Sequence, residues 1–311
     1  MLLKTADNKE SQLAILKNFL DHDKIPADKK QLIEKELRNM LVGIATEKQA
    51  AYEIDFGFES SKNLIVLHDL RLEINGRVAQ IDHLLMNRAF DVYVLETKTF
   101  NTEVSINKMG EFSIIHNGRE MGIPSPVEQN ARHISVLKDA FKLIGLPTRL
   151  GITIQPSFHS VVLVSQQAVI NRQQEDKSHK NIIKIDQFYS WYHEKLEHSS
   201  ARDVIAILKV CSSKTIKSLG EKIVTMHKPC RIDYVKKFDL IDILSNKEAP
   251  LRSPAVSIEA SEVVAAEVKE GGKYFCATCR KNIADVVAKF CWNNKTRFGG
   301  KAYCRACQFK F

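Results

Sequence analysis

The spacing of hydrophobic positions changes near residue 63. Before that point, apolar residues recur every three or four positions over residues 9–20 and again from Pro26 to Ala51, which predicts two helices. After it, apolar residues alternate or run together, and Asn75-Gly76 has the composition of a two-residue hairpin turn. The pattern therefore predicts two helices followed by an antiparallel meander of three strands, at residues 64–72, 77–86 and 91–99.

The pattern after the meander predicts a helix, a buried strand and further helices. Residues 103–119 have the spacing of a small extra hairpin, and Pro126 opens an amphipathic helix that reaches Ile144. A nearly continuous apolar run at 158–165 indicates a buried strand, and residues 182–224 are expected to be mostly helical. This order of elements predicts an α/β fold, with a mixed sheet flanked by helices.

The composition is that of an ordinary globular protein. The 311 residues are 44% hydrophobic and 27% charged, and no apolar run is long enough to span a membrane. The first ten residues lack the apolar stretch of a secretory signal. No Gly-rich loop ending in Gly-Lys-Ser/Thr is present to bind nucleotide phosphates. We therefore expect a cytoplasmic protein with no membrane contact and no nucleotide cofactor.

Two Cys-x-x-Cys pairs, Cys276 with Cys279 and Cys304 with Cys307, are separated by 24 residues near the end of the sequence. A structural Zn²⁺ takes four soft ligands in a tetrahedron, and each pair supplies two sulfurs. A tail of 39 residues is too short to fold on a hydrophobic core alone, which favours a structural zinc ribbon. Cys291 is either a packing residue, which we favour, or an alternative ligand.

The positive charge of the chain is concentrated in the same tail. The formal net charge is +9, and residues 273–311 hold nine Lys or Arg residues against one acid, Asp285, which is a formal +8. Aromatic residues are interleaved with these cations, a composition that suits the bases and phosphates of a nucleic acid. A zinc ribbon that docks on a protein is the alternative. The candidate nucleic-acid contacts are Arg280, Lys281, Lys289, Trp292, Lys295, Arg297, Lys301 and Arg305.

Asp82, Glu96 and Lys98 are the candidate catalytic residues of the meander. Glu96 and Lys98 are two positions apart on one strand, so their side chains share a face, and the intervening turn can bring Asp82 beside them. Two neighbouring carboxylates repel each other, and Mg²⁺ or Mn²⁺, which prefer oxygen ligands, would resolve that repulsion. Lys98 would then position water or stabilise charge on a phosphate. The competing interpretation is a solvated strand face, and His83, on the opposite face, is interpreted as a packing residue.

These residues lie within a stretch, residues 43–165, that resembles the nuclease-related domain (NERD) family of the PD-(D/E)xK restriction-endonuclease-like superfamily. The family's Gly-x-x-Gly-Glu helix is similar to Gly43–Glu47, although Thr46 replaces the second Gly. Its Asn-Pro-x-x-Gln helix start is similar to Ser125–Gln129, with Ser in place of Asn. The matching strand segments are His68–Leu70, Gln80–Leu85, Leu95–Lys98 and Val161–Ser165.

The resemblance implies an αβββαβ core with Mg²⁺ held by Asp82 and Glu96. From the residues alone, Glu47 and Gln129 are more typical of a surface carboxylate and of an amide in the first turn of a helix. The tail resembles the topoisomerase-type four-Cys zinc finger, which implies that Cys276, Cys279, Cys304 and Cys307 hold Zn²⁺. The complete site implied by the family comprises Glu47, Asp82, Glu96, Lys98 and Gln129.

The predicted function is metal-dependent hydrolysis of a nucleic acid, with DNA favoured, by an endonuclease or nickase whose tail binds the substrate. The alternatives are a nuclease fold that binds DNA without cleaving it, and a protein-interaction module. The expected segments are an N-terminal helical segment (1–42), the nuclease-related core (43–170), a helical extension (171–245), a flexible linker (246–272) and the zinc ribbon (273–311).

Overall fold

The structure is a computed structural model that describes residues 1–100, 102–116, 118–172, 180–200, 210–245, 274–283, 287–288, 291–292, 298–304 and 307. The chain divides into two compact units, Met1–Lys247 and Glu248–Phe311. The segment predicted to be a flexible linker, residues 246–272, lies outside the described residues.

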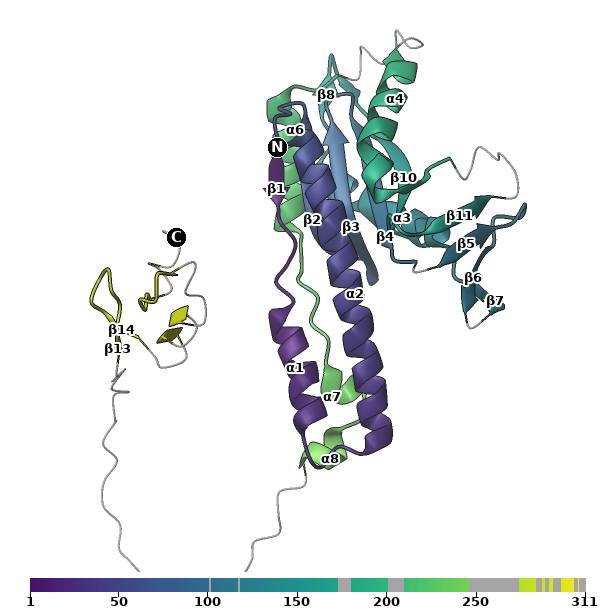
Figure 1. Ribbon diagram of the computed structural model, residues 1–311. Coiled ribbons are helices and arrows are strands. Elements are labelled where there is room, and N and C mark those ends of the chain that lie inside the picture. Colours follow the sequence, from purple (N-terminus) through teal and green to yellow (C-terminus); the bar gives the residue numbers. More distant parts are fainter. Residues whose placement is uncertain are drawn as a thin grey trace, which may run out of the picture. The chain divides into compact units, whose positions relative to one another are not determined.

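The first unit is built on a mixed sheet (Figure 1) of six strands: β1 (Leu2–Lys4), β2 (Leu64–Ile74), β3 (Arg77–Asn87), β4 (Asp91–Lys98), β10 (Ser157–Val164) and β12 (Ile182–Lys184). Their order across the sheet is β1-β2-β3-β4-β10-β12. The predicted meander is confirmed, because β2 pairs antiparallel with β3 and β3 with β4. The predicted buried strand, β10, runs parallel to β4. The sheet therefore places the two strands with the candidate residues at its centre.

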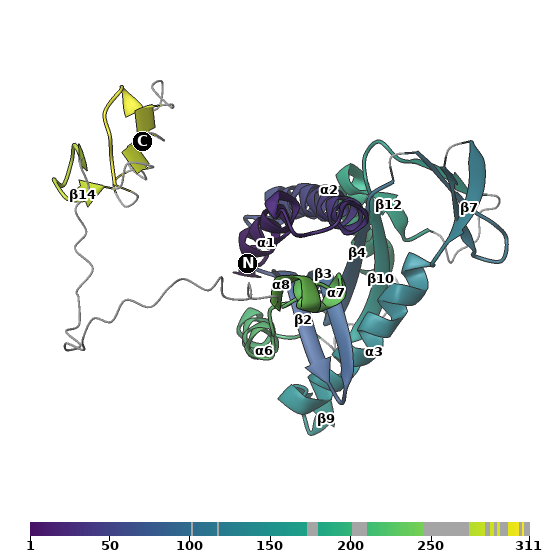
Figure 2. The same ribbon diagram turned by 90° about the horizontal axis from the view of Figure 1, so that it is seen from below.

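Helices cover both faces of this sheet (Figure 2). One face is covered by α2 (Ala27–Phe58), η2 (Ile185–Gln187) and α4 (Phe188–Ser200), and the other by α3 (Pro126–Ile144) and α6 (Ser213–Thr225). Strand alternation sorts the core: Leu84 and Val94 pack on the α3 side, whereas Leu85 and Leu95 pack on the α2 side. The expected αβββαβ order is present as α2, β2, β3, β4, α3 and β10.

The first half of α2 packs away from the central strands, against α1 (Glu10–Asp21) and two short helices, α7 (Tyr234–Lys237) and α8 (Ile241–Ser245). Leu16, Ile33 and Tyr234 are buried in this contact. α2 runs without interruption across the boundary expected between residues 42 and 43. None of the helices that the structure describes is both long enough and apolar enough to cross a membrane.

A second sheet of four strands contains the hairpin predicted at residues 103–119. β5 (Glu103–Ile106), β6 (Phe112–His116) and β7 (Arg119–Ile123) are antiparallel, and β11 (Val169–Arg172) pairs parallel with β5. A short hairpin, β8 (Thr148–Arg149) with β9 (Ile152–Thr153), follows α3. Residues 182–224 are mostly helical, as expected, in the part that the structure describes, with the exception of their start, where β12 extends the central sheet. A strand of three residues is too short for alternation to separate it from a helix.

Asn130 fixes α3 to the centre of the sheet. Its side chain is fully buried, and Nδ2 donates to the carbonyl of Val94 (2.6 Å), to the hydroxyl of Ser160 (3.0 Å) and to the carbonyl of Val161 (3.2 Å). We expect Asn130→Ala to lower the free energy of unfolding by about 2 kcal/mol, since buried acceptors lose their donor. Urea denaturation measures this loss. Arg132→Ala, at an exposed position of the same helix, is the control, and equal stability of the two variants would contradict the assignment.

Candidate functional site

Asp82 lies where the pairing of β3 with β4 ends. The last paired residues are His83 and Leu95, and one position further along β3 the Oδ2 atom of Asp82 accepts the backbone N–H of Thr97 at 2.7 Å. This bond holds a half-buried carboxylate of one strand against the backbone between Glu96 and Lys98 on the other. The structure therefore brings together the three residues that the sequence predicted on neighbouring strands.

Glu96, Lys98 and Gln129 form a closed set of hydrogen bonds. The Oε1 atom of Glu96 accepts from the Nζ of Lys98 at 2.8 Å and from the Nε2 of Gln129 at 2.8 Å, and Lys98 also donates to the Oε1 of Gln129 at 3.0 Å. Gln129 is placed there by the first turn of α3, where the side chain of Ser125 accepts the backbone N–H of Glu128 and caps the helix. Each end of Gln129 therefore fixes one of the two charged groups.

One carboxylate oxygen in this set has no hydrogen bond. Glu96 is 3% exposed, and its Oε2 atom is buried without a hydrogen-bond partner in the described structure. The Nδ1 of His133 on α3 lies 3.5 Å from this oxygen, beyond the distance of a strong hydrogen bond. Burial lowers the pKa of His133 to about 4, so its imidazole is neutral near pH 7. A buried carboxylate oxygen with an open acceptor position is a suitable ligand atom for a divalent cation.

The surroundings of Asp82 and Glu96 disfavour the charged form of both carboxyl groups. Burial raises the pKa of Asp82 well above its usual range, and the charges of Glu96 and Glu47 raise it further, against the effects of the Thr97 N–H and Lys98. Burial also raises the pKa of Glu96, although Lys98 acts to lower it. Ionising both carboxylates in this arrangement is unfavourable unless a cation compensates them.

Glu47, on α2, is near the site but outside the closed set. Its carboxylate pairs with the Nζ of Lys9 at 2.7 Å, and its charge reaches Asp82. Within the described part of the chain, only four cysteines bring three or more candidate metal-ligand atoms within 4.8 Å of one another. Glu47, Asp82 and Glu96 therefore do not converge on one point as a three-carboxylate site in this arrangement.

Three further side chains at the site were not predicted: Lys9, Asp69 and His133. Asp69 lies on β2 opposite Asp82 and has a left-handed backbone with φ of 51°, which Asp tolerates better than most residues. A cavity of about 280 Å³ reaches Lys9, Glu47, Asp69 and Asp82. His68-Asp69-Leu70 gave a sequence signal only as a strand match, and Lys9, at the start of the helix predicted over residues 9–20, gave none.

His83 lies on the face opposite Asp82, as strand alternation predicts. Its Nδ1 is 2.7 Å from the Nδ1 of His68, whose Nε2 is 3.1 Å from the Oδ1 of Asp55 on α2. A carboxylate accepts only, so Asp55 requires a proton on the Nε2 of His68, and His83 then donates through Nδ1. Burial lowers the pKa of His83 well below its usual range, and the residue is a neutral, buried link between the sheet and α2.

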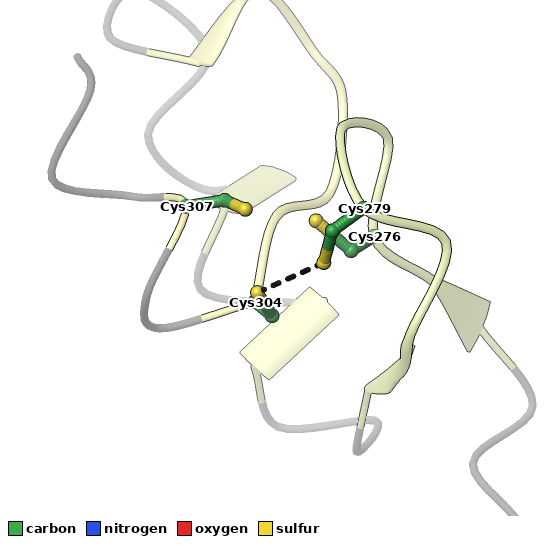
Figure 3. A group of neighbouring side chains, drawn as sticks. All are labelled: Cys276, Cys279, Cys304 and Cys307. Carbon is green, nitrogen blue, oxygen red and sulfur yellow. Dashed lines mark hydrogen bonds between the residues drawn. The ribbon is translucent and has the colours of Figure 1, made fainter.

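The second unit contains the predicted four-cysteine cluster (Figure 3). The sulfurs of Cys276, Cys279, Cys304 and Cys307 lie within 4.8 Å of one another, and those of Cys279 and Cys304 are 3.5 Å apart. Four thiolates at these separations fit a tetrahedral Zn²⁺. A short antiparallel pair, β13 (Tyr274–Phe275) with β14 (Asn282–Ile283), carries the first knuckle. Cys291 is buried, accepts the N–H of Tyr303 at 3.4 Å and lies outside the cluster, in agreement with a packing role.

The predicted nucleic-acid contacts of the tail divide into three groups. Arg280, Lys281 and Lys301 are exposed. Trp292 is half-buried and packs edge-on against Tyr274 with ring centroids 5.0 Å apart, so the structure makes it part of the small core. Phe275, with 61% of its surface exposed, is the more accessible ring. The remaining candidates, Lys289, Lys295, Arg297 and Arg305, lie outside the described residues.

Comparison with known proteins agrees with the geometry of the first unit. Residues 42–165 match the model of the family described as nuclease-related domain (NERD). No curated protein and no solved structure gives a significant match to the chain. The match covers α2 from residue 42 onward and every strand and helix that contributes Glu47, Asp82, Glu96, Lys98 and Gln129. Residues 42–165 therefore form a nuclease-related, restriction-endonuclease-like domain, followed in the same chain by a four-cysteine cluster that can hold zinc.

Proposed function

We propose that the chain is a metal-dependent nuclease that hydrolyses phosphodiester bonds of DNA. The observation that carries the proposal is the open, buried Oε2 of Glu96 beside the anchored carboxylate of Asp82. These groups are costly to ionise without a cation, and their oxygens suit Mg²⁺ or Mn²⁺. The nuclease-related domain supports nucleic acid as the substrate class.

In this proposal Asp82 and Glu96 hold the divalent cation, which supplies Lewis-acid stabilisation of the phosphate when bound. The ammonium of Lys98 stabilises the negative charge that develops on the phosphate and orients the attacking water. Gln129 holds the side chains of Lys98 and Glu96 in place, with one hydrogen bond to each. Glu47 acts from a greater distance, through its field at Asp82 and its ion pair with Lys9.

The tail is proposed to bind the same substrate. Arg280, Lys281 and Lys301 offer three exposed cations, and Phe275 offers an exposed ring that can stack on an unpaired base. Two binding units in one chain raise the local concentration of DNA at the first unit. The four-cysteine tail therefore binds the substrate, and the nuclease-related domain hydrolyses it.

Cleavage of supercoiled plasmid by the purified, zinc-loaded chain tests the proposal. We expect nicked or linear product with Mg²⁺ or Mn²⁺ and none with EDTA, because EDTA removes the cation that balances Asp82 and Glu96. Melting of the protein measured in parallel is expected to shift upward with Mn²⁺, as for any ligand that binds the folded state. DNA binding without any metal-dependent product would contradict the enzymatic assignment and favour a non-cleaving DNA-binding protein.

A further inference from the structure

The ammonium group of Lys9 is a cation that lies among the carboxylates at the end of the sheet where Asp69 and Asp82 are found. The Nζ of Lys9 is 2.7 Å from the Oε2 of Glu47 and 3.7 Å from the Oδ2 of Asp69. The positive charge of Lys9 also interacts with the carboxylate of Asp82. One ammonium group therefore lies among carboxylates from α2, β2 and β3, at positions 47, 69 and 82 of the sequence.

The segment that carries Lys9 is fixed in place on both sides. On its N-terminal side, the carboxylate of Asp7 pairs with Lys4 at 2.8 Å and with His227 at 2.9 Å, and the backbone N–H of Asp7 donates to Asp69 at 3.3 Å. On its C-terminal side, Lys9 is the N-cap residue of α1, which packs along α2. The side chain of Lys9 is only 18% exposed. Its position at the carboxylates is therefore built into the fold.

Lys9 makes its ion pairs with carboxylates that lie outside the closed set of Glu96, Lys98 and Gln129. Glu96 is hydrogen-bonded by Lys98 and Gln129, whereas Glu47 and Asp69 are paired with Lys9. A divalent cation and an ammonium cannot share the same carboxylate oxygens, because their charges repel at such short distances. A buried oxygen of Glu96 is therefore open to a metal ion, whereas the carboxylates of Glu47 and Asp69 are already paired with a positive charge.

We propose that Lys9 is a resident counter-ion that takes the place of a second metal ion, so that the site binds one divalent cation at Asp82 and Glu96 and excludes another from Glu47 and Asp69. The inference rests on the proposed metal binding by Asp82 and Glu96. Lys9 is a positioning residue here, since it sets the charge and the free ligands of the site. Removing its ammonium leaves the carboxylates of Glu47 and Asp69 without the cation that pairs with them in the described structure, which is a condition that favours capture of another cation.

Titration of Mn²⁺ into the zinc-loaded full-length chain, followed by calorimetry and by the electron paramagnetic resonance of free Mn²⁺, tests this assignment. The wild-type chain is expected to bind one Mn²⁺. Lys9→Met is expected to bind a second Mn²⁺, because the ammonium that pairs with Glu47 and Asp69 is gone. Lys9→Arg, which keeps the charge, should behave as wild type. Binding of only one Mn²⁺ by Lys9→Met would overturn the proposal.

Matched variants separate this effect from general electrostatics and from folding. Lys48 lines the same cavity but makes no ion pair within the described residues, so Lys48→Met should leave Mn²⁺ binding unchanged. Asp69→Asn should also retain one Mn²⁺ of wild-type affinity, since the carboxylate of Asp69 pairs with Lys9 and not with the proposed metal ion; a ten-fold loss would overturn the proposal even if Lys9→Met does not fold.

Asp82→Asn distinguishes this inference from the proposed function. If Asp82→Asn binds Mn²⁺ as tightly as wild type, the metal site of the proposed function is wrong. If Asp82→Asn loses Mn²⁺ while Lys9→Met matches wild type, only the role of Lys9 is wrong.

Discussion

Asp82→Asn will abolish metal-dependent cleavage, and Lys98→Met will slow it on the order of 100- to 1,000-fold while leaving metal binding intact. The two residues lie together but have different partners. The carboxylate of Asp82 accepts the N–H of Thr97. An amide at this position is a poor metal ligand, and it lacks the negative charge that would balance the cation. Lys98 donates to Glu96 and Gln129, so its loss removes a positive charge and frees both acceptors.

The separation of these two effects is measured by combining initial rates of plasmid nicking with Mn²⁺ calorimetry. Lys98→Met should keep wild-type stoichiometry and bind Mn²⁺ at least as tightly, because a cation beside Glu96 is gone. Lys35→Met, at an exposed position of α2 in the half that packs on α1, is the matched control and should cleave at the wild-type rate. If Lys98→Met cleaves normally, or if it fails only because Mn²⁺ no longer binds, the role assigned to Lys98 is wrong.

The sequence predicts the centre of the site well because its geometry is local. Glu96 and Lys98 share a face through strand alternation alone, and Asp82 reaches them across a short turn. Gln129 is different: it is 31 residues from Lys98, and three strands of the second sheet, β5, β6 and β7, lie between them in the chain. Only the resemblance to a family placed Gln129 at the site. The structure adds the reason, which is that the capped first turn of α3 presents Gln129 to both Glu96 and Lys98.

The cavity beside this centre, which is lined by Lys9, Glu47 and Asp69, could not be predicted from the sequence in the same way. Lys9 reaches it because β1, a strand of three residues, pairs parallel with β2 and directs the following segment toward α2. So short a strand has no recognisable hydrophobic period. Asp69 faces the pocket with a left-handed backbone in the middle of a strand, a conformation that propensity does not reveal. Glu47 could be assigned to the site from the family motif, but its ion pair with Lys9 could not. This ion pair determines whether the carboxylate of Glu47 is available to a metal ion.

Thr46 shows how a departure from the family motif is accommodated. It stands where the resemblance leads one to expect Gly, and it is buried next to the end of β4. Its hydroxyl bonds back to the carbonyl of Val42 at 3.1 Å and lies 2.5 Å from the hydroxyl of Thr99. The side chain thus ties α2 to the residue that follows β4. Glu47 is the next residue on the helix, so this tie fixes the position of Glu47 relative to Lys98.

Removal of zinc will unfold the tail and leave the nuclease-related domain folded. Among the described residues of the second unit, the buried core consists of eight side chains, three of them cysteines, and so small a core does not fold without a metal. Zinc binding in isolated zinc-finger peptides contributes about 10–16 kcal/mol, which is far more than such a core provides. We therefore expect Cys279→Ser, or treatment with a strong chelator, to release one zinc per chain and to make the tail sensitive to proteolysis.

The same change separates capture of DNA from its hydrolysis. If the tail binds DNA through Arg280, Lys281 and Lys301, Cys279→Ser should lower DNA affinity and flatten its dependence on salt, because phosphate contacts are lost. Cleavage of plasmid at high DNA concentration should persist, since Asp82, Glu96 and Lys98 belong to the other unit. Cys230→Ser, at a half-buried cysteine outside the cluster, is the control and should retain zinc. Unchanged affinity and salt dependence after loss of zinc would assign the tail to a protein partner.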